Sequence, residues 1–257
     1  MAKYGSPAGV FLFDGYSLLA DKLQGSRQLI SANSEPSTSF GDGWEENLPT
    51  GMRRGELAQE GAFFSDDAGS FHERLAGASG SPDSDVNGTP GVACVGFEGN
   101  LLGQEFVGYS GALAVSYEVI STVNSVTRAN AEYVISGIVE RGEIVVALAS
   151  TSGDGDSEST PVDGGAGNAP STDGGSAYLQ MTALDLSGRP DLQVTVRDSD
   201  DNIVYGDLVA FTAVTAAPAG ERVTVAGNVE RYVAADWVYG GAAGTPTATF
   251  FVGFARN

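Results

Sequence analysis

The chain has 257 residues, 42% of them apolar, and its 33 acidic against 13 basic residues give a formal net charge of −20. This length suits one large domain or two small ones with a sizeable core. The acidic excess argues against a protein that binds nucleic acid by neutralising phosphates, or one that binds an anionic membrane.

The beginning of the chain carries no convincing targeting signal. Asp14 and Gly15 interrupt the apolar stretch of the first 19 residues, unlike the continuous apolar core of a signal peptide. No apolar run in the sequence approaches the roughly 18 residues that cross a membrane. We therefore expect a soluble protein made without a secretory address. A single cysteine excludes an intrachain disulfide.

The first 150 residues are predicted to be β-rich with one helix. Short segments rich in β-branched and aromatic residues are typical of strands. The helix is expected at 66–77, because Phe71 and Leu75 are four positions apart and would face the core together. The expected strands are 10–13, 28–32, 56–64, 92–98, 106–109, 112–123, 131–137 and 142–149.

The composition changes at residues 151–176. This stretch consists almost wholly of Gly, Ser, Thr, Asp and Pro and has no aromatic residue. Such a segment cannot bury enough apolar surface to offset the entropy of ordering it. The sequence therefore predicts a first domain at 1–150, a linker or exposed loop at 151–176 and a second domain at 177–257.

The second domain is predicted to be a small immunoglobulin-like β-sandwich, so the whole chain belongs to the mainly-β class. Short alternating segments separated by turn signals are typical of this architecture. The expected strands are 178–184, 192–196, 202–205, 208–213, 221–225, 231–238 and 247–254. Alternation places these residues in the core: Leu192, Val194, Val196, Phe211, Val223, Val225, Tyr232, Trp237, Phe250 and Val252.

Few residues suit catalysis or metal binding. The only histidine, His72, lies on the expected helix in a position typical of packing, and Cys94 lies in an apolar strand. The acidic runs 154–158 and 198–202 alternate oxygen-bearing side chains, but neither has the glycine and glutamate spacing of an EF-hand loop. We expect no catalytic, cofactor or metal site, and a structural or binding protein rather than an enzyme.

Several features of the first domain occur in a particular order. An opening strand at 9–19 precedes a long polar loop at 37–67, then the helix and long strands at 105–149. The loop carries Gly-Asp-Gly-Trp at 41–44, Leu-Pro-Thr-Gly at 48–51 and Glu-Gly-Ala-Phe-Phe-Ser-Asp-Asp at 60–67. In these features the chain resembles the tail tube (major tail) proteins of long-tailed, siphovirus-like phages. Residues 177–257 resemble the small β-sandwich domains appended to phage tail and head proteins.

This resemblance implies a structural role in a virion. Six subunits would form a ring whose strands complete an inner β-barrel, and stacked rings would form a hollow tail tube. Partners would be further copies of the chain, the tape measure protein and other tail proteins. Viral DNA would pass without specific binding, since a negative lumen repels phosphates. The protein would be made in the host cytoplasm and would reside in the virion tail.

The resemblance also implies where subunits touch. The long polar loop would reach a neighbouring subunit, with an aromatic anchor as a plausible hot spot. The residues expected to make contacts between subunits or rings are Phe40, Asp42, Trp44, Leu48 and Pro49.

Other kinds of protein remain open. A capsid decoration or other head protein is also built from β-sandwiches, but it gives no reason for the long loop followed by a helix and long strands. A carbohydrate-binding module would need Trp237, Tyr239 and Tyr205 exposed to stack on sugars, whereas such aromatics more often lie in a core. A hydrolase would have to use His72 as its base.

Overall fold

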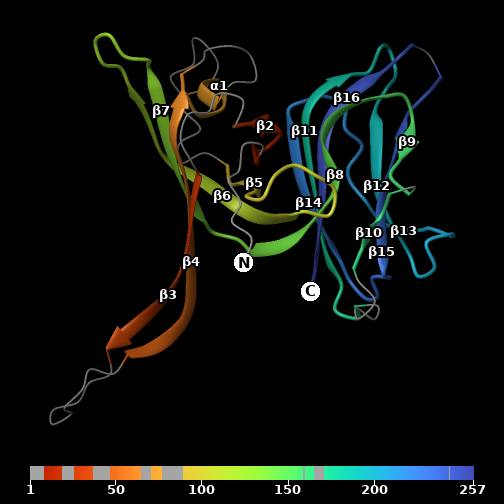
Figure 1. Ribbon diagram of the computed structural model, residues 1–257, viewed down its shortest axis with the longest axis horizontal. Helices are drawn as coiled ribbons and strands as arrows, with labels where there is room; N and C mark the ends of the chain where they lie inside the picture. Colours follow the sequence, from red (N-terminus) through yellow and green to blue (C-terminus); the bar gives the residue numbers. More distant parts are fainter. Residues whose placement is uncertain are drawn as a thin grey trace.

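The computed structural model describes residues 9–18, 26–36, 47–64, 71–76, 89–158, 160–164, 171–242 and 244–257. Antiparallel strands dominate these residues, which confirms the mainly-β fold class (Figure 1). The elements are β1 (Val10–Phe13), β2 (Tyr16–Ser17), β3 (Ser26–Pro36), β4 (Asn47–Phe63), α1 (Phe71–Ala76), β5 (Gly91–Gly96), β6 (Glu105–Ile120), β7 (Arg128–Ile135), β8 (Val139–Ser152), β9 (Gly155–Asp156), β10 (Val162–Asp163), β11 (Gly175–Asp185), β12 (Leu192–Ser199), β13 (Gly206–Ala210), β14 (Ala219–Val225), β15 (Tyr232–Tyr239) and β16 (Thr247–Arg256).

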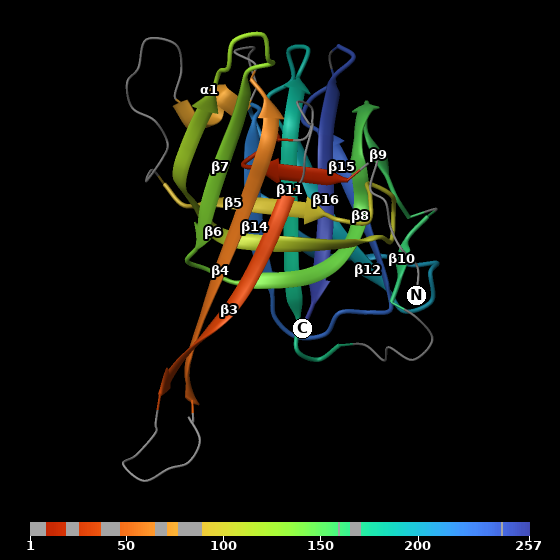
Figure 2. The ribbon, with the colours of Figure 1, turned by 60° about the vertical axis from the view of Figure 1, so that its left-hand side comes forward.

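The larger, 11-stranded sheet divides at β6. The start of β6 pairs with β8 and its later part pairs with β7, while β5 pairs along the opposite edge of β6. From there one arm runs through β7 and β4 to β3, and the other runs through β8, β16 and β11 to β14. Figures 1 and 2 show the two arms diverging from β6.

Two Ser-Gly pairs hold the point where the arms separate. The backbone N–H groups of Ser110 and Ser136 donate to the carbonyls of Ile138 and Gly111, at 2.9 Å and 3.0 Å. The Ile138 N–H donates to Ser110 Oγ at 2.8 Å, and Ser136 Oγ donates to the Gly111 carbonyl at 2.8 Å. Gly111 has φ +64°, and a Cβ at Gly137 would overlap the Ser110 carbonyl. The junction therefore requires small residues at both pairs.

The second arm forms one layer of a β-sandwich with the five-stranded sheet of β10, β15, β12 and β13, to which β9 adds. The predicted core is confirmed for Leu192, Val194, Val196, Phe211, Val225, Phe250 and Val252, and Val223 and Trp237 pack against it partly buried. Tyr232 was wrongly placed there, because on β15 Val233 and Ala235 point inward and the Tyr232 ring lies under the Arg231 guanidinium instead.

β11 is buried on both faces and joins the two parts of the molecule. Ala177, Leu179 and Met181 point into the sandwich core. Tyr178, between them in the alternation, packs in a second cluster with residues of β1, β5, β6 and β16. A third cluster lies around β1, β5, β6 and β7 and includes Leu75 of α1. Because the clusters share strands, the N-terminal and C-terminal residues pack against one another.

The segment 151–176 is not a linker in its described residues. β8 continues to Ser152, pairing with β16, and β9 and β10 both pair with β15. Ser157 is buried and its Oγ accepts from the Ala235 N–H at 2.9 Å. Backbone hydrogen bonds, rather than apolar side chains, attach the described residues of this segment to the sandwich, and the division into 1–150, 151–176 and 177–257 stays a prediction. The domain boundary drawn there crosses paired strands. The immunoglobulin-like character of 177–257 stays a prediction.

Several predicted elements have different bounds. The separate strands 106–109 and 112–123 are one strand, β6. The helix is described only over Phe71–Ala76, and the rest of 66–77 lies outside the described residues. Residues 202–205 were wrongly predicted as a strand, since they form a turn in which Asp201 Oδ1 accepts from the N–H groups of Ile203 and Val204.

Candidate functional site

The β3–β4 hairpin extends away from the rest of the molecule. The two strands pair from Ser26 opposite Gln59 to Pro36 opposite Asn47. β7 supports β4 only over Gly55–Phe63, so the outer part of the hairpin is two-stranded within the described chain. Figures 1 and 2 show this part, in orange-red, projecting beyond both arms. An isolated two-stranded ribbon is marginally stable in water, so this projection suits contact with another surface.

Two of the five predicted contact residues lie on this projection. Leu48 pairs with Glu35, and Pro49 pairs with Ser34, near its outer end. Phe40, Asp42 and Trp44 fall outside the described residues. The contact role of all five stays a prediction. Sequence reasoning treated Leu48 and Pro49 as part of a long loop, whereas they belong to a 17-residue strand.

The outer edge of β3 is the second notable feature of this arm. Among the described residues β3 pairs with β4 alone, so its other edge presents backbone N–H and C=O groups along 11 residues. Leu29 on this strand is 43% exposed. The nearby ion pair of Arg27 with Glu60, at 3.9 Å, is solvent-exposed and contributes little stability. Natural proteins cover or pair such a long edge, because it otherwise recruits strands from other chains.

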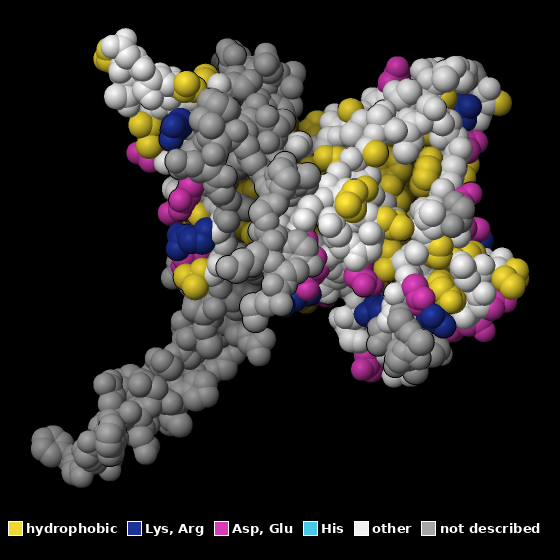
Figure 3. Space-filling model, viewed as in Figure 1, with side chains coloured by type: hydrophobic (Ala, Val, Ile, Leu, Met, Phe, Trp, Pro, Cys, Tyr) yellow, Lys and Arg dark blue, Asp and Glu magenta, His cyan; other side chains and the backbone are white. Residues whose placement is uncertain are grey.

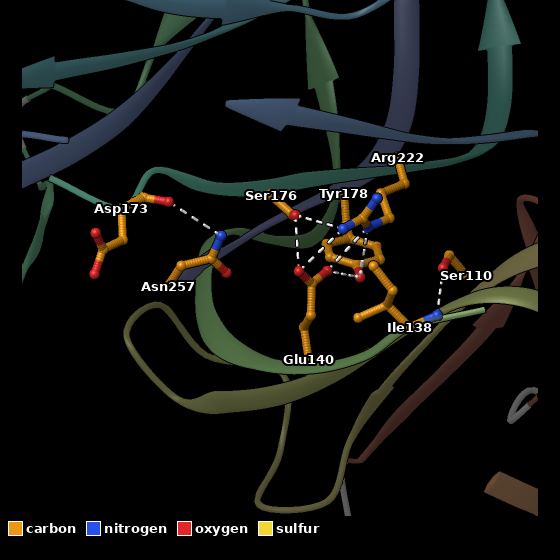
Figure 4. Close-up of polar contacts among 8 residues, drawn as sticks. All are labelled: Ser110, Ile138, Glu140, Asp173, Ser176, Tyr178, Arg222 and Asn257. Carbon is orange, nitrogen blue, oxygen red and sulfur yellow. Dashed lines mark hydrogen bonds and ion pairs between the residues drawn. The ribbon is translucent and has the colours of Figure 1, made fainter. Parts of the chain in front are cut away.

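A charged cluster fixes the start of β8 to β11 and β14, further along the second arm. The Glu140 carboxylate receives Arg222 Nε at 2.9 Å and Nη2 at 3.0 Å, Ser176 Oγ at 2.9 Å, and the Tyr178 hydroxyl (Figure 4). The Glu140 and Arg222 side chains are only 11% and 13% exposed. Burial raises the pKa of Glu140, but the hydrogen bonds from Arg222, Tyr178 and Ser176 outweigh it and hold this pKa below its ordinary value.

A second polar bridge ties α1 and the first strands to β11. Asp14 accepts from Arg74 Nη2 at 2.9 Å and from the Val92 N–H at 2.7 Å. Beside it, the Gly15 N–H donates to Gln180 Oε1 at 2.7 Å, and Gln180 Nε2 donates to the Val92 carbonyl at 3.0 Å. The first bridge joins β8 to β11 and β14, and the second joins the β1–β2 turn, α1 and β5 with β11. Sequence reasoning missed them, since no local pattern links residues so far apart in the chain.

The residues considered for catalysis have structural surroundings. His72 Nδ1 lies 2.7 Å from the Tyr117 hydroxyl, and its ring packs between Phe64 and Tyr117. Cys94 is fully buried, and this burial raises the pKa of its thiol. Hydrogen bonds from the backbone of Val204 and Ile203 hold the pKa of Asp201 below its ordinary value. In the part of the chain that the structure describes, no three His, Cys, Asp or Glu residues are grouped to hold a metal ion.

The aromatics considered for sugar binding are not exposed. Tyr239 is 2% and Tyr205 9% exposed. Trp237 lies edge-on to Phe250, with ring centroids 5.5 Å apart, and packs over Gly155. The alternative of an exposed stacking platform built from these residues therefore has no support, and the reading of Trp237 as a core residue agrees with its packing. Their apolar faces fill the sandwich instead.

The chain is similar to a few solved structures at low identity. One is a chain in the tail of an empty gene transfer agent particle with C6 symmetry, at 16% identity and a TM-score of 0.40, covering 54% of this chain and 97% of that one. A chain of the native gene transfer agent virion matches with the same values. The Dit protein of SPP1, a hub of the adsorption apparatus of phages that infect Gram-positive hosts, matches at 11% identity and a TM-score of 0.35. The match covers 97% of this chain and 99% of that one.

At these values the similarity by itself assigns no function to the chain. No protein-family model matches the sequence, and no curated protein matches it. Among the described residues, no helix has the length and apolar character needed to span a membrane.

Proposed function

We propose that this chain is a structural subunit of a viral tail, and that its copies form stacked hexameric rings around a hollow tube through which viral DNA passes. The observation that carries this proposal is the 11-residue outer edge of β3, which has no partner among the described strands and belongs to the projecting β3–β4 hairpin. The proposal agrees with the tail particles in which the similar chains occur.

Ring closure gives this edge a partner. A strand of a neighbouring copy can pair with β3 and continue the β7–β4–β3 arm into the next subunit. When the last subunit meets the first, no β3 edge is left open. The projecting hairpin, which carries Leu48 and Pro49, would reach the neighbouring subunit or ring.

The charge of the chain suits passage of DNA rather than binding. A net charge of −20 repels phosphates, so a duplex can move through a lumen formed by these subunits without adhering. The partners in this proposal are further copies, the tape measure protein and other tail proteins. The protein acts in the virion tail after synthesis in the host cytoplasm, without enzymatic activity or a cofactor.

Electron microscopy of a matched set of variants tests the proposal. Leu29→Glu adds a charge at the β3 edge, where Leu29 is 43% exposed, and should abolish rings. The control is Leu101→Glu in the β5–β6 turn, where Leu101 is 65% exposed and far from the edge in the pairing order. We expect end-on views of rings for the wild type and for Leu101→Glu, and no rings for Leu29→Glu. Equal ring formation by Leu29→Glu would contradict the role of β3.

A further inference from the structure

The turn between β6 and β7 presents exposed aliphatic side chains among uncharged polar ones. We call residues 119–127 the hairpin tip. No acidic or basic residue occurs in it, although the chain as a whole carries 46 such residues, 33 acidic and 13 basic. Val123 is 89% exposed, and Val126, Val119 and Ile120 are 53%, 43% and 42% exposed. Figure 3 shows apolar side chains at this tip. Four exposed aliphatic side chains on one turn are typical of a protein contact.

The hairpin tip is held in one conformation. The Ser125 N–H donates to the Thr122 carbonyl at 3.0 Å, and Thr127 Oγ1 donates to Ser121 Oγ at 3.3 Å. The Thr127 carbonyl also accepts from the N–H of Phe64, at the end of β4. A surface ordered before binding loses less entropy when a partner covers it.

The charge of the chain indicates which partner covers the hairpin tip. Two copies that each carry −20 repel, so they can meet most readily where no charged group must be desolvated. The turn at Ile203 and Val204 is exposed to a similar degree, 79% and 72%, but it follows Asp200 and Asp201 and precedes Asp207. A second copy would therefore meet more negative charge at that turn than at the hairpin tip, whose flanking residues Glu118 and Arg128 have opposite charges.

The position of the hairpin tip allows it to act together with β3. Figures 1 and 2 show the tip and the projecting β3–β4 hairpin at opposite ends of the same arm. One copy can therefore use both surfaces at once without competition. We infer that the hairpin tip docks onto a second copy of this chain and joins one layer of the assembly to the next. This inference rests on the proposed function, and it adds the surface through which layers meet.

A pair of charge substitutions tests the inference. Val123→Glu should raise the protein concentration needed for half-assembly by at least about tenfold, as expected when a buried anchor is lost. Ile203→Glu is the control, matched in exposure, and should leave this concentration unchanged. Analytical ultracentrifugation over a concentration series measures both. Equal assembly by Val123→Glu and the wild type would overturn the inference and leave the proposed function standing. A wild type that remains a single copy throughout would overturn both.

A cross-linking experiment identifies what the hairpin tip touches. The one natural cysteine, Cys94, is fully buried, so Val123→Cys offers the accessible thiol for a maleimide–benzophenone probe. On irradiation of the assembled protein we expect a covalent dimer, and mass spectrometry of its peptides locates the receiving surface. Ile203→Cys, labelled in the same way, should give no dimer. A dimer from Ile203→Cys and none from Val123→Cys would contradict the inference.

Discussion

Glu140 and Arg222, 82 positions apart in the sequence, face each other across the second arm in a paired contact, Nε to Oε2 at 2.9 Å and Nη2 to Oε1 at 3.0 Å. Glu140 follows the point where the large sheet divides, and Arg222 lies on β14, at the far end of the second arm. Ser176 and Tyr178 of β11 complete the hydrogen bonds of the carboxylate (Figure 4). This ion pair therefore fixes the position of the start of β8 relative to β14.

Loss of one partner of this pair should destabilise the protein strongly. Arg222→Met leaves a mostly buried carboxylate without its cation, which costs about 2–4 kcal/mol of unfolding free energy. Urea denaturation followed by tryptophan fluorescence measures the loss. Arg27→Met is the matched control, because Arg27 and Glu60 form an ion pair whose side chains are 58% and 60% exposed. Equal stabilities of the two variants would contradict a structural role for Glu140 and Arg222.

The same carboxyl group should make stability depend on pH. Its folded-state pKa lies below the ordinary value of 4.5, so ionised Glu140 stabilises the fold above that pH. This contribution is lost as the pH falls through the lowered pKa. We therefore expect the difference in unfolding free energy between the wild type and Glu140→Gln to shrink as the pH falls from 7 to 3.

The pH comparison is best made as a difference between the two proteins. Burial raises the pKa of Glu143 and of Asp236, and these groups favour the folded state at low pH. Their contribution has the opposite sign to that of Glu140, but it is common to both proteins and cancels. A difference that stays constant with pH would mean that Glu140 is not held ionised by Arg222.

The junction of the two arms should not tolerate a larger residue. Gly137→Ala places a methyl group against the Ser110 carbonyl, and the overlap should cost about 1–3 kcal/mol. Gly206→Ala is the control, because a Cβ at Gly206 meets no atom within 4 Å. Its effect should stay within about 0.5 kcal/mol. Thermal unfolding by circular dichroism checks both, and a Gly137→Ala variant as stable as the wild type would contradict the observed packing.

Cys94 should react only when the protein opens. It is fully buried, and burial keeps its thiol protonated. We expect Ellman's reagent to label the urea-unfolded chain at once and the native chain no faster than it unfolds. Fast stoichiometric labelling of the native protein would place Cys94 at the surface, and the cross-linking experiment would then need Cys94→Ala as its background.

The sequence predicted those elements in which side-chain alternation matches burial. Val10–Phe13 has the predicted bounds, and Leu192, Val194 and Val196 point into the core as expected. The sequence does not predict elements that are held mainly by backbone pairing. Examples are the part of β4 before Gly55, and β9 and β10, because their residues show no apolar periodicity. The pairing of Glu140 with Arg222 depends on strand order, which no local pattern encodes.

The candidate site was predictable only in part. The resemblance implies contacts at Leu48 and Pro49, and both residues lie on the projecting hairpin. The unpaired edge of β3 could not be predicted, since an edge is defined by the strands that lie beside it in space. The sequence predicts part of the hairpin tip as the end of a strand at 112–123, because exposed and buried aliphatic residues cannot be told apart by their type alone.

A cryo-electron microscopy map of the particles formed by the wild-type chain tests the central claim most directly, because it shows what lies beside the outer edge of β3. The account predicts a closed sixfold ring, with a strand of the neighbouring copy paired to β3 and a central hole wide enough for a DNA duplex. Rings in which β3 faces solvent, or single copies at every concentration, would contradict it.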